Sequence, residues 1–584
     1  TRTTAALLQP GRERKRRWEQ SGQRERERER ARAERRERNR GKHHKGHLKM
    51  LRGDQKDPMI EDLRKRRDVV LRLVESQNDE KALEILHQHA KKGKKEYELV
   101  VPGLMYGVLA YNNLRESLVS IQNLVAISDD DSHEVLGREL IRLLDHDLRF
   151  EAMHTVTKMK VIDIVSNIAN VAVAFDSLLI VMARLMVGIC FRIDFGTSDG
   201  SWVAQYGEKL MHLISENLSR LTRRDDTISI LIYNLLGMIH EHTSIPLSKR
   251  GPLHKWLKLE IDVCYELMQT GSQAWKHHGR DIIRVLARVK KIGKFSEIWN
   301  KLANEDDGLA LSRALSRATN PRILAGRVSP NMWKDLMFML KKVYTGKQAK
   351  IQKLFVKKFL KSEFSDVLRP DIVRFICGGY HPPNHVLASQ ILPRYMTIGW
   401  LYFTPMKKQS RPTIMRSVLW DMFSFNADDG NVMNIEPAAL LLVKSIPKYP
   451  NVSAEILKLL TETSSFPFQN AAKSIGFALR KLLKLDVIKP RELSKVLECE
   501  KINPSIKNAF KLKFGEAISN STSKSGGNES SSTPTLPSSS QTPFPSSTST
   551  TTTSPPPEAL TAKRGPAAAT AAQRMGVSKS HGQQ

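Results

Sequence analysis

Apolar residues recur at the spacing of an α-helix through most of the chain. Two segments show the period of about 3.6 residues clearly. Their apolar positions are Ile282, Leu286, Val289 and Ile292 in the first, and Ile475, Leu479, Leu482 and Leu485 in the second. The sequence has no series of alternating apolar segments separated by Asn-Gly or Asp-Gly turns, which would indicate strands. The pattern predicts an all-α protein.

Prolines mark where several of these helices should begin, because the first helical turn needs no N–H from its first residue. The six prolines at such positions are Pro321, Pro330, Pro370, Pro437, Pro490 and Pro504. Asn320, Ser329 and Asn503 precede three of them and can cap free N–H groups. Many helices joined by short connections, without a strict sequence repeat, predict a HEAT-like α-solenoid. A compact multi-helix domain is the alternative.

Composition divides the chain into three parts. Residues 1–56 contain the low-complexity run RERERERARAERRERNRGKHHKGH, which has no apolar stripe to dock it. We expect this basic arm to be disordered or a lone charged helix, with an RNA-binding arm as the alternative. Residues 519–584 form a Ser/Thr/Pro-rich tail that cannot bury apolar area and should be disordered. Residues 57–518 are predicted to be the folded helical domain.

The net charge of +32 is distributed over the whole chain. Residues 1–56 hold 20 Lys and Arg against 8 Asp and Glu, while residues 57–519 hold 68 against 51. A basic body indicates an acidic partner or nucleic acid, although such an excess also serves solubility. The chain begins at Thr1, as expected of a fragment or an imperfect gene model.

No membrane or secretory segment is expected. The N-terminus is arginine-rich and lacks an apolar signal region. The most apolar window, residues 161–193, contains Asp163, Asp176 and Arg184, which a membrane span would rarely tolerate. Buried helices are the better interpretation of this window.

Residues 373–400 raise the question of a reactive site, because Cys377, His381 and His385 lie close together. Two adjacent glycines and two adjacent prolines interrupt this stretch. We expect the glycines to supply the positive φ of a helix C-cap, and Asn384 to cap the next helix. A third ligand at usable spacing is missing, so a structural corner is favoured over a metal or thiol site.

Other chemical motifs are weaker. GTSDG matches G-x-S-x-G around Ser198, but the βα alternation that a nucleophile elbow needs is missing around it. HEHTS, residues 240–244, lacks the i,i+4 histidine pair of zinc proteases. The four cysteines are far apart, which suits a reducing compartment. We expect no catalytic residue, metal or cofactor, and we expect Cys377, His381 and Ser198 to be dispensable for any chemistry.

A basic segment, KKVYTGKQAKIQKLFVKKFLKSEF at residues 341–364, is more informative. Its candidate contacts to a nucleic-acid backbone are Lys350, Lys353, Lys357, Lys358 and Lys361. Lysines with long apolar stems also form ordinary solvated helix faces, so both interpretations stay open. Phe355 and Phe359 fit the core stripe better than base-stacking positions.

Residues 279 to about 450 carry four segments that resemble the N-terminal half of the Integrator complex subunit 3 family, which is also the A subunit of the sensor of single-stranded DNA complex. They are GRDIIRVLARVKKIGKFSEIW, RILAGRVSPNMWKDLMFML, LRPDIVRFICGGYHPPNHVLASQILPRYMTIGWL and NVMNIEPAALLLVKSIPKYPNVSA. MNIEPA is the most distinctive piece. Residues 60–278 are compatible but more diverged, and the arm and tail show no resemblance.

The resemblance implies a non-catalytic, HEAT-like scaffold in the nucleus. It implies a platform that grips an OB-fold single-stranded-DNA-binding subunit and a small accessory subunit in the DNA damage response. Through other Integrator subunits it implies small nuclear RNA processing and transcription attenuation. The family's second helical half, associated with dimerisation and docking to other subunits, has no counterpart in this chain. The alternative function is a helical repeat protein that binds RNA or DNA directly through its lysine face and Arg-rich arm.

Overall fold

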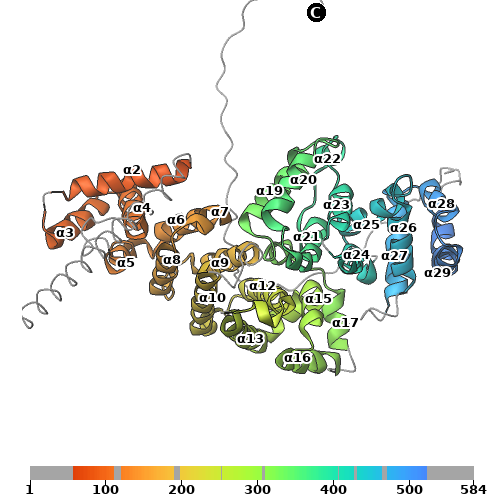
Figure 1. Ribbon diagram of the computed structural model, residues 1–584, viewed down its shortest axis with the longest axis horizontal. Helices are drawn as coiled ribbons and strands as arrows, with labels where there is room; N and C mark the ends of the chain where they lie inside the picture. The colour runs from red at the N-terminus through yellow and green to blue at the C-terminus, as the bar shows by residue number, and fades with distance from the viewer. Residues whose placement is uncertain are drawn as a thin grey trace, which may run out of the picture. The chain divides into compact units, whose positions relative to one another are not determined.

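The computed structural model describes residues 57–522, except for 76, 111–119, 190–197, 222, 252, 305–308, 406, 427–429 and 463–469. Within these described residues every regular element is a helix, and one isolated antiparallel bridge joins Tyr344 to Ile391 (Figure 1). The all-α prediction is therefore confirmed. The basic arm at 1–56 and residues 523–584 of the Ser/Thr/Pro-rich tail lie outside the described residues, so their predicted disorder stays a prediction. Residues 519–522, which the composition assigned to that tail, belong to the last described helix, α29 (Pro504–Thr522).

The N-terminal helices pack mainly against near neighbours in the chain. They are α2 (Pro58–Leu73), α3 (Asp79–Ala90), α4 (Lys94–Ala110), α5 (Ile121–Ile127), α6 (Glu134–Leu144), α7 (Asp147–Ala152), α8 (Thr155–Ile168), α9 (Phe175–Ile189), α10 (Ser198–Glu216) and α11 (Leu218–Leu221), with a 3₁₀ turn η1 (Asp129–Asp131). Helix α4 packs on α2, α3, α5 and α6, and α8 packs on α10. The apolar window at 161–193 contributes to α8 and α9, whose described apolar residues are largely buried.

The central helices are arranged around α12 (Asp225–Ser244). They continue with η2 (Leu247–Lys249), α13 (Leu253–Thr270), α14 (Ser272–His277), α15 (Arg280–Val289), α16 (Gly293–Asn304), α17 (Leu309–Ser316), α18 (Pro321–Ala325), α19 (Pro330–Lys342), α20 (Ala349–Phe359), η4 (Glu363–Val367), α21 (Arg369–Arg374) and the π-helix η5 (Phe375–Gly379). Helix α12 packs on α9, α13, α14, α15 and α18. It is therefore buried around much of its circumference, unlike a helix at the surface.

The C-terminal helices again pack mainly on their neighbours. They are α22 (Asn384–Leu387), α23 (Arg394–Phe403), η6 (Lys408–Ser410), α24 (Arg411–Leu419), η7 (Met422–Ser424), α25 (Val432–Lys444), α26 (Pro450–Thr461), α27 (Ala471–Lys484), α28 (Pro490–Glu498) and α29 (Pro504–Thr522). Helix α25 packs on α23, α24, α26, α27 and α28, and α29 packs on α26, α27 and α28.

Packing between near neighbours agrees with the predicted HEAT-like solenoid, in which each unit contacts mainly the next. One departure is α19, which packs on α7 and α9 as well as on α20. The buried apolar residues form one contiguous cluster across the described helices. No helix among these residues is both long and apolar enough to cross a membrane.

Five of the six prolines predicted to start helices do so, in α18, α19, α21, α28 and α29. The side chains of Asn320, Ser329 and Asn503 accept a first-turn backbone N–H at 2.9, 3.4 and 2.8 Å. The prediction at Pro437 is wrong, because this residue lies inside α25. An interior proline cannot donate to the carbonyl four residues earlier, so that carbonyl needs another donor.

Candidate functional site

The predicted corner is a π-helical turn rather than a glycine C-cap. Helix α21 continues directly into Phe375–Gly379, and neither Gly378 nor Gly379 has a positive φ. The predicted C-cap is therefore wrong. A Cβ on Gly378 would lie 2.9 Å from Cδ1 of Leu324, and one on Gly379 would lie 2.6 Å from Cδ2 of Phe375. Close packing against the Phe375 ring favours glycine at position 379, and a left-handed conformation plays no part.

The predicted Asn384 cap is also wrong, because Asn384 is the first residue of α22 and Pro383 takes the N-cap position without a side-chain acceptor. Cys377 is fully buried, and burial raises the pKa of its thiol to about 12. His381 Nε2 lies 2.7 Å from Oδ1 of Asn434. Among the residues that the structure describes, no three His, Cys, Asp or Glu side chains gather as a metal site would require.

Arg394 binds the backbone carbonyl groups at the end of the π-helix. Its Nη1 lies 3.3, 3.1 and 3.0 Å from the backbone carbonyl oxygens of Ile376, Cys377 and Tyr380. These carbonyls lie in and just after the π-helix, where a helix end leaves acceptors without intrahelical donors. One buried guanidinium therefore terminates this helix, a role that the sequence pattern assigned to the glycines.

The same guanidinium explains the interior proline of α25. Nη2 of Arg394 donates to the carbonyl of Met433 at 2.7 Å and to Oε2 of Glu436 at 2.6 Å. Met433 is four residues before Pro437, so its carbonyl is the acceptor that the proline leaves open. Helix α4 contains a comparable arrangement. Its interior Pro102 cannot donate to the carbonyl of Glu98, and Nη1 of Arg66 donates to that carbonyl at 2.6 Å.

A buried ionic network joins α15, α21 and the start of η7. Asp281 accepts Nε of Arg284 at 2.9 Å, and Nε and Nη2 of Arg374 at 2.9 and 3.1 Å. Arg374 Nη2 lies 2.8 Å from Asp421, whose other oxygen is 2.7 Å from Nη1 of Arg280. All of these side chains are buried.

A second carboxylate extends the network to α12. Asp371 accepts Nη2 of Arg284 at 2.8 Å and Nε of Arg327 at 3.1 Å, and Nη1 of Arg288 lies 3.6 Å away. Arg327 also pairs with Glu241 of α12. Burial alone would raise the pKa of Asp371, but the surrounding guanidinium groups outweigh it and lower the pKa to about 2.

The remaining motifs from the sequence are parts of the core or the surface. In HEHTS, Glu241 belongs to the ionic network, and Nδ1 of the buried His242 lies 2.7 Å from Oε2 of Glu260. Ser198 is the first residue of α10, and its side chain lies outside the described ones. The dispensability of Cys377, His381 and Ser198 for any chemistry stays a prediction.

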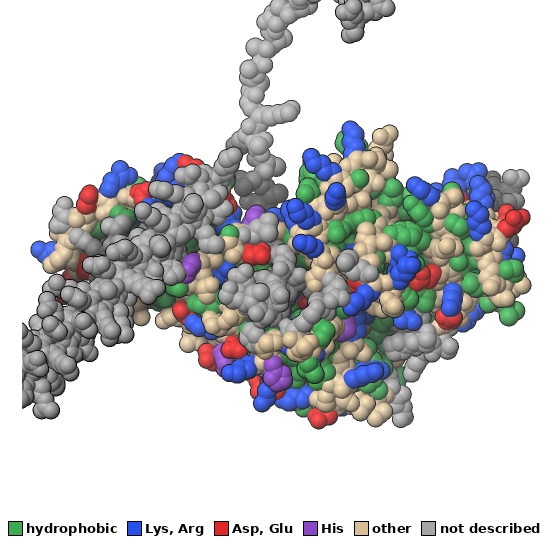
Figure 2. All heavy atoms as spheres, viewed as in Figure 1, with side chains coloured by type: hydrophobic (Ala, Val, Ile, Leu, Met, Phe, Trp, Pro, Cys, Tyr) green, Lys and Arg blue, Asp and Glu red, His purple; other side chains and the backbone are tan. Residues whose placement is uncertain are grey.

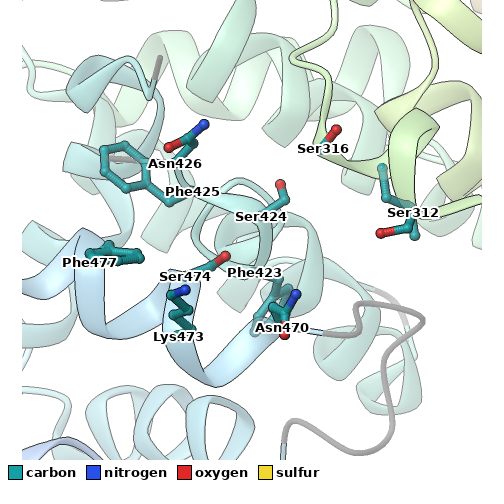
Figure 3. Close-up of a pocket in the computed structure, with 11 residues that line it drawn as sticks. Ser312, Ser316, Phe423, Ser424, Phe425, Asn426, Asn470, Lys473, Ser474 and Phe477 are labelled. Atoms are coloured by element: carbon teal, nitrogen blue, oxygen red, sulfur yellow. The ribbon is translucent and has the colours of Figure 1, made fainter. Parts of the chain in front are cut away.

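A cavity of about 210 Å³ lies between α17, η7 and α27. Figure 3 shows its lining residues, and in the described set Lys473 is the ionisable one. The others that line it are Ser312, Leu315, Ser316, Phe423, Ser424, Phe425, Asn426, Asn470, Ser474 and Phe477. The remaining lining is therefore neutral, with serine and asparagine side chains beside apolar ones.

Residues 349–359 of the basic segment form α20, Lys341 and Lys342 end α19, and Lys361 lies just beyond α20. Lys350, Lys353, Lys357 and Lys361 are exposed. Lys358 is half-buried, and its Nζ lies 2.8 Å from Oδ2 of Asp335 on α19. The expected core positions, Phe355 and Phe359, are fully buried. Figure 2 shows Lys and Arg side chains gathered over the surface where α19 and α20 lie in Figure 1.

The sequence patterns did not predict Arg394 or the ionic network. A signal for the network was present: Asp281 with Arg284, and Asp371 with Arg374, are acid and arginine pairs spaced i,i+3 beside buried apolar residues of the same helices. Charges at such positions are almost never buried unless they are paired. The segments that carry the family resemblance contain these four residues and Arg394.

A protein-family model described as Integrator complex subunit 3 N-terminal matches residues 95–512. The Integrator complex subunit 3 homolog of Dictyostelium discoideum is 30% identical over 347 residues, covering 58% of this chain and 23% of that protein. Integrator complex subunit 3 of Mus musculus is 25% identical over 413 residues, covering 70% of this chain and 38% of that protein. The chain thus spans less than two fifths of these relatives. Since the family model matches well over half of the chain, the chain belongs to the Integrator complex subunit 3 family and corresponds to its N-terminal region.

Proposed function

We propose that this chain is a non-catalytic scaffold in the nucleus, acting in the Integrator complex and in a single-stranded DNA sensor complex. It holds an OB-fold single-stranded-DNA-binding subunit, together with a small accessory subunit and other Integrator subunits. The observation that carries the proposal is the match of residues 95–512 to the family model over one contiguous helical core. Its roles are in the DNA damage response, small nuclear RNA processing and transcription attenuation.

The buried network supports a rigid scaffold. Asp281 and Asp371 connect arginines from α15, α21 and the α18–α19 connection. Helices far apart in the sequence are therefore held in fixed positions relative to one another. A fixed arrangement lowers the cost of ordering a docking surface when a partner binds. A scaffold role depends on such surfaces and requires no nucleophile, base or metal.

The first prediction tests the scaffold itself. Full-length chain co-expressed with an OB-fold single-stranded-DNA-binding subunit should co-purify with it as a complex of defined mass by size-exclusion chromatography with light scattering. The complex should persist at high salt, because docking surfaces of this kind are usually apolar at their centre. The control is the same OB-fold subunit expressed alone. Elution of the two proteins as separate species would contradict the proposal.

The second prediction concerns α20. We propose that Lys350, Lys353, Lys357 and Lys361 add electrostatic support to a strand held mainly by the OB-fold partner. Replacing Lys350, Lys353 and Lys357 by Glu should weaken binding of the complex to a fluorescent single-stranded oligonucleotide. The slope of log affinity against log salt should flatten by about 0.7 for each phosphate group that the variant no longer binds. Lys358 is left unchanged because its pair with Asp335 joins α19 to α20.

A control for these lysines, which changes two charges instead of three, is available on α13. Lys255 and Lys258 are exposed on that helix, and their replacement by Glu changes the net charge of another surface. An unchanged salt slope in the α20 variant would assign its lysines to a solvated face. Loss of the OB-fold subunit from the α20 variant would instead identify α20 as the protein interface.

A second candidate function is direct binding of RNA or DNA by this chain. The observation in its favour is the set of exposed lysines on α20. The salt titration repeated on the chain without its partner separates the two candidates, because only direct binding predicts measurable affinity there.

A further inference from the structure

Two aromatic side chains meet at the surface where α23 ends and α26 begins. Phe403 is the last residue of α23, and Tyr449 immediately precedes α26. Their ring centroids are 4.8 Å apart with an interplanar angle of 46°. Phe403 is 39% exposed and Tyr449 is 44% exposed, whereas the adjacent Tyr402 is buried. The pair therefore presents aromatic surface to solvent instead of completing the core.

The aromatic pair is held in place before any ligand arrives. Tyr449 stands between Pro447 and Pro450, whose fixed φ angles restrict the backbone. Phe403 packs edge-on against Tyr402 at 5.1 Å, and the Tyr402 hydroxyl donates to the carboxylate of Glu455. Little conformational entropy remains to be lost when a planar ligand stacks here.

Two basic residues lie against this pair, and two more are exposed on a nearby connection. The Arg411 guanidinium carbon lies 5.8 Å from the Phe403 ring centroid, and Lys448 Nζ lies 5.5 Å from that of Tyr449. Lys407 and Lys408 are exposed on the connection between α23 and α24. The backbone N–H of Lys407 donates to Asp366 at 2.8 Å, which fixes the connection beside the rings.

The acids beside the patch are already engaged. Asp366 is buried, and it accepts Nε of Arg369 at 2.9 Å and the Ser410 hydroxyl at 3.0 Å. Glu455 accepts the hydroxyl of Tyr402. Asp366 is therefore paired inside the fold, and the exposed side chains named in this patch are cationic or aromatic. Such a surface is complementary to a polyanion that carries flat bases.

Helix α23 also connects this patch to α20. Trp400 packs edge-on against Phe355 of α20, with ring centroids 5.9 Å apart. Phe403 follows Trp400 by three residues, and residues at that spacing are neighbours on a helix surface. The aromatic pair thus lies one helical turn from the contact between α23 and the lysine-bearing helix.

We propose that Phe403 and Tyr449 form a stacking platform for the bases of a single-stranded nucleic acid, with Lys408, Arg411 and Lys448 contacting its phosphates. The combination of aromatic faces and cations is the one that binds single strands without sequence preference. This inference rests on the second candidate function, direct binding of a strand by this chain, and names the residues that would carry it. It therefore stands or falls independently of the partner subunit.

The test uses the full chain alone and the double variant Phe403→Leu/Tyr449→Leu, which keeps apolar volume but removes both rings. The probes are fluorescein-labelled oligo-dT, oligo-rU and an abasic oligomer of equal length. The variant should bind oligo-dT, oligo-rU or both about 10-fold more weakly, since stacking on one aromatic side chain is worth about one decade in affinity. Binding of the abasic oligomer should not change. The oligomer that loses affinity identifies DNA or RNA as the natural strand.

Two controls keep the test decisive. Phe338→Leu removes an aromatic ring that is 49% exposed on α19, outside the platform, and should bind like wild type. Tyr449→Leu alone leaves the packing of Phe403 on Tyr402 intact, and it replaces the double variant if circular dichroism shows that the latter is unfolded.

Equal affinity of folded variant and wild type for oligo-dT and oligo-rU would overturn the proposal, as would equal losses on all three oligomers. Normal oligonucleotide binding by the variant alone, with loss of the OB-fold subunit when the two are co-expressed, would also overturn it and would assign the patch to a protein partner. A scaffold complex that fails to form leaves this experiment unaffected, so failure of the two proposals is distinguishable.

Discussion

Replacing Asp371 by Asn is expected to lower the free energy of unfolding by about 3–5 kcal/mol. The two side chains have nearly the same shape, so no cavity forms. The loss arises because Arg284 and Arg327 would keep their charges in the core without the carboxylate that lies 2.8 and 3.1 Å from them. The measurement is the urea midpoint followed by circular dichroism, with an unchanged dependence on urea concentration.

Asp335→Asn is the matched control for this variant. Asp335 lies 2.8 Å from Lys358, the same distance as Asp371 from Arg284, but both members of this pair are partly solvated. A solvated ion pair is worth about 0–1 kcal/mol, so the midpoint should hardly move. Similar losses in the two variants would mean that burial does not determine the strength of the network.

The pH dependence of stability follows from the same carboxylate. The pKa of Asp371 is about 2 in the folded chain, whereas an unfolded aspartate has a pKa of about 3.9. A lowered pKa stabilises the fold above the unfolded value, and that contribution is lost as the pH falls from about 4 to about 2. Burial alone would raise the pKa of Asp281, but Arg374 and Arg284 lower it, so Asp281 acts in the same direction. The Asp371→Asn variant should therefore lose less stability than wild type over this pH range.

The helical secondary structure and many helix starts could be predicted, because they depend on residues close together in the sequence. Asn320, Ser329 and Asn503 cap helices within a few residues of themselves, and the period of apolar residues identifies the buried stripe. Phe355 and Phe359 were assigned to the core from this period, and both are fully buried. Information carried by neighbouring residues was therefore sufficient for these elements.

The buried ionic network and the contacts of Arg394 could not be predicted from local pattern, because the residues that pair lie far apart in the sequence. Asp281 meets Arg374 across 93 residues, and Arg280 meets Asp421 across 141. Pro437 looks like a helix start until Arg394 supplies the donor for the carbonyl that it frees. Tertiary contacts override local propensity at these positions.

Within the candidate site, local pattern was also insufficient to assign each lysine of the basic segment. The sequence placed five lysines on one helix, and four of them are exposed in or just after α20. It could not distinguish Lys358, because Asp335 belongs to α19 and reaches Lys358 only after the two helices pack. The exposed aromatic pair Phe403 and Tyr449 was missed for the same reason, since the rings come from segments 46 positions apart.

The second large effect on stability is expected for substitutions of Arg394, which joins the π-helix to α25. Arg394→Met should lower the free energy of unfolding by about 3–5 kcal/mol, because it leaves the half-buried Glu436 unpaired and removes the donor of four backbone carbonyls. Arg394→Lys should recover only part of this loss. An ammonium group has three donors at one point and cannot span the carbonyls of the π-helix together with those of α25. Arg491→Met, which removes an exposed arginine on α28, is the control and should change stability little.

The reactivity of the Cys377 thiol shows whether Arg394 stabilises the π-helix. With Arg394 in place, Cys377 is buried and its thiol pKa is about 12, so it should react slowly with a disulfide reagent under native conditions. In Arg394→Met the carbonyls of the π-helix lose their donor, the turn should open more often, and Cys377 should react faster. Cys264, buried in α13, should remain slow, and mass spectrometry of the labelled peptides separates the two sites. If both thiols accelerate equally, the variant loosens the whole core; selective labelling of Cys377 means that one guanidinium holds the junction between the π-helix and α25.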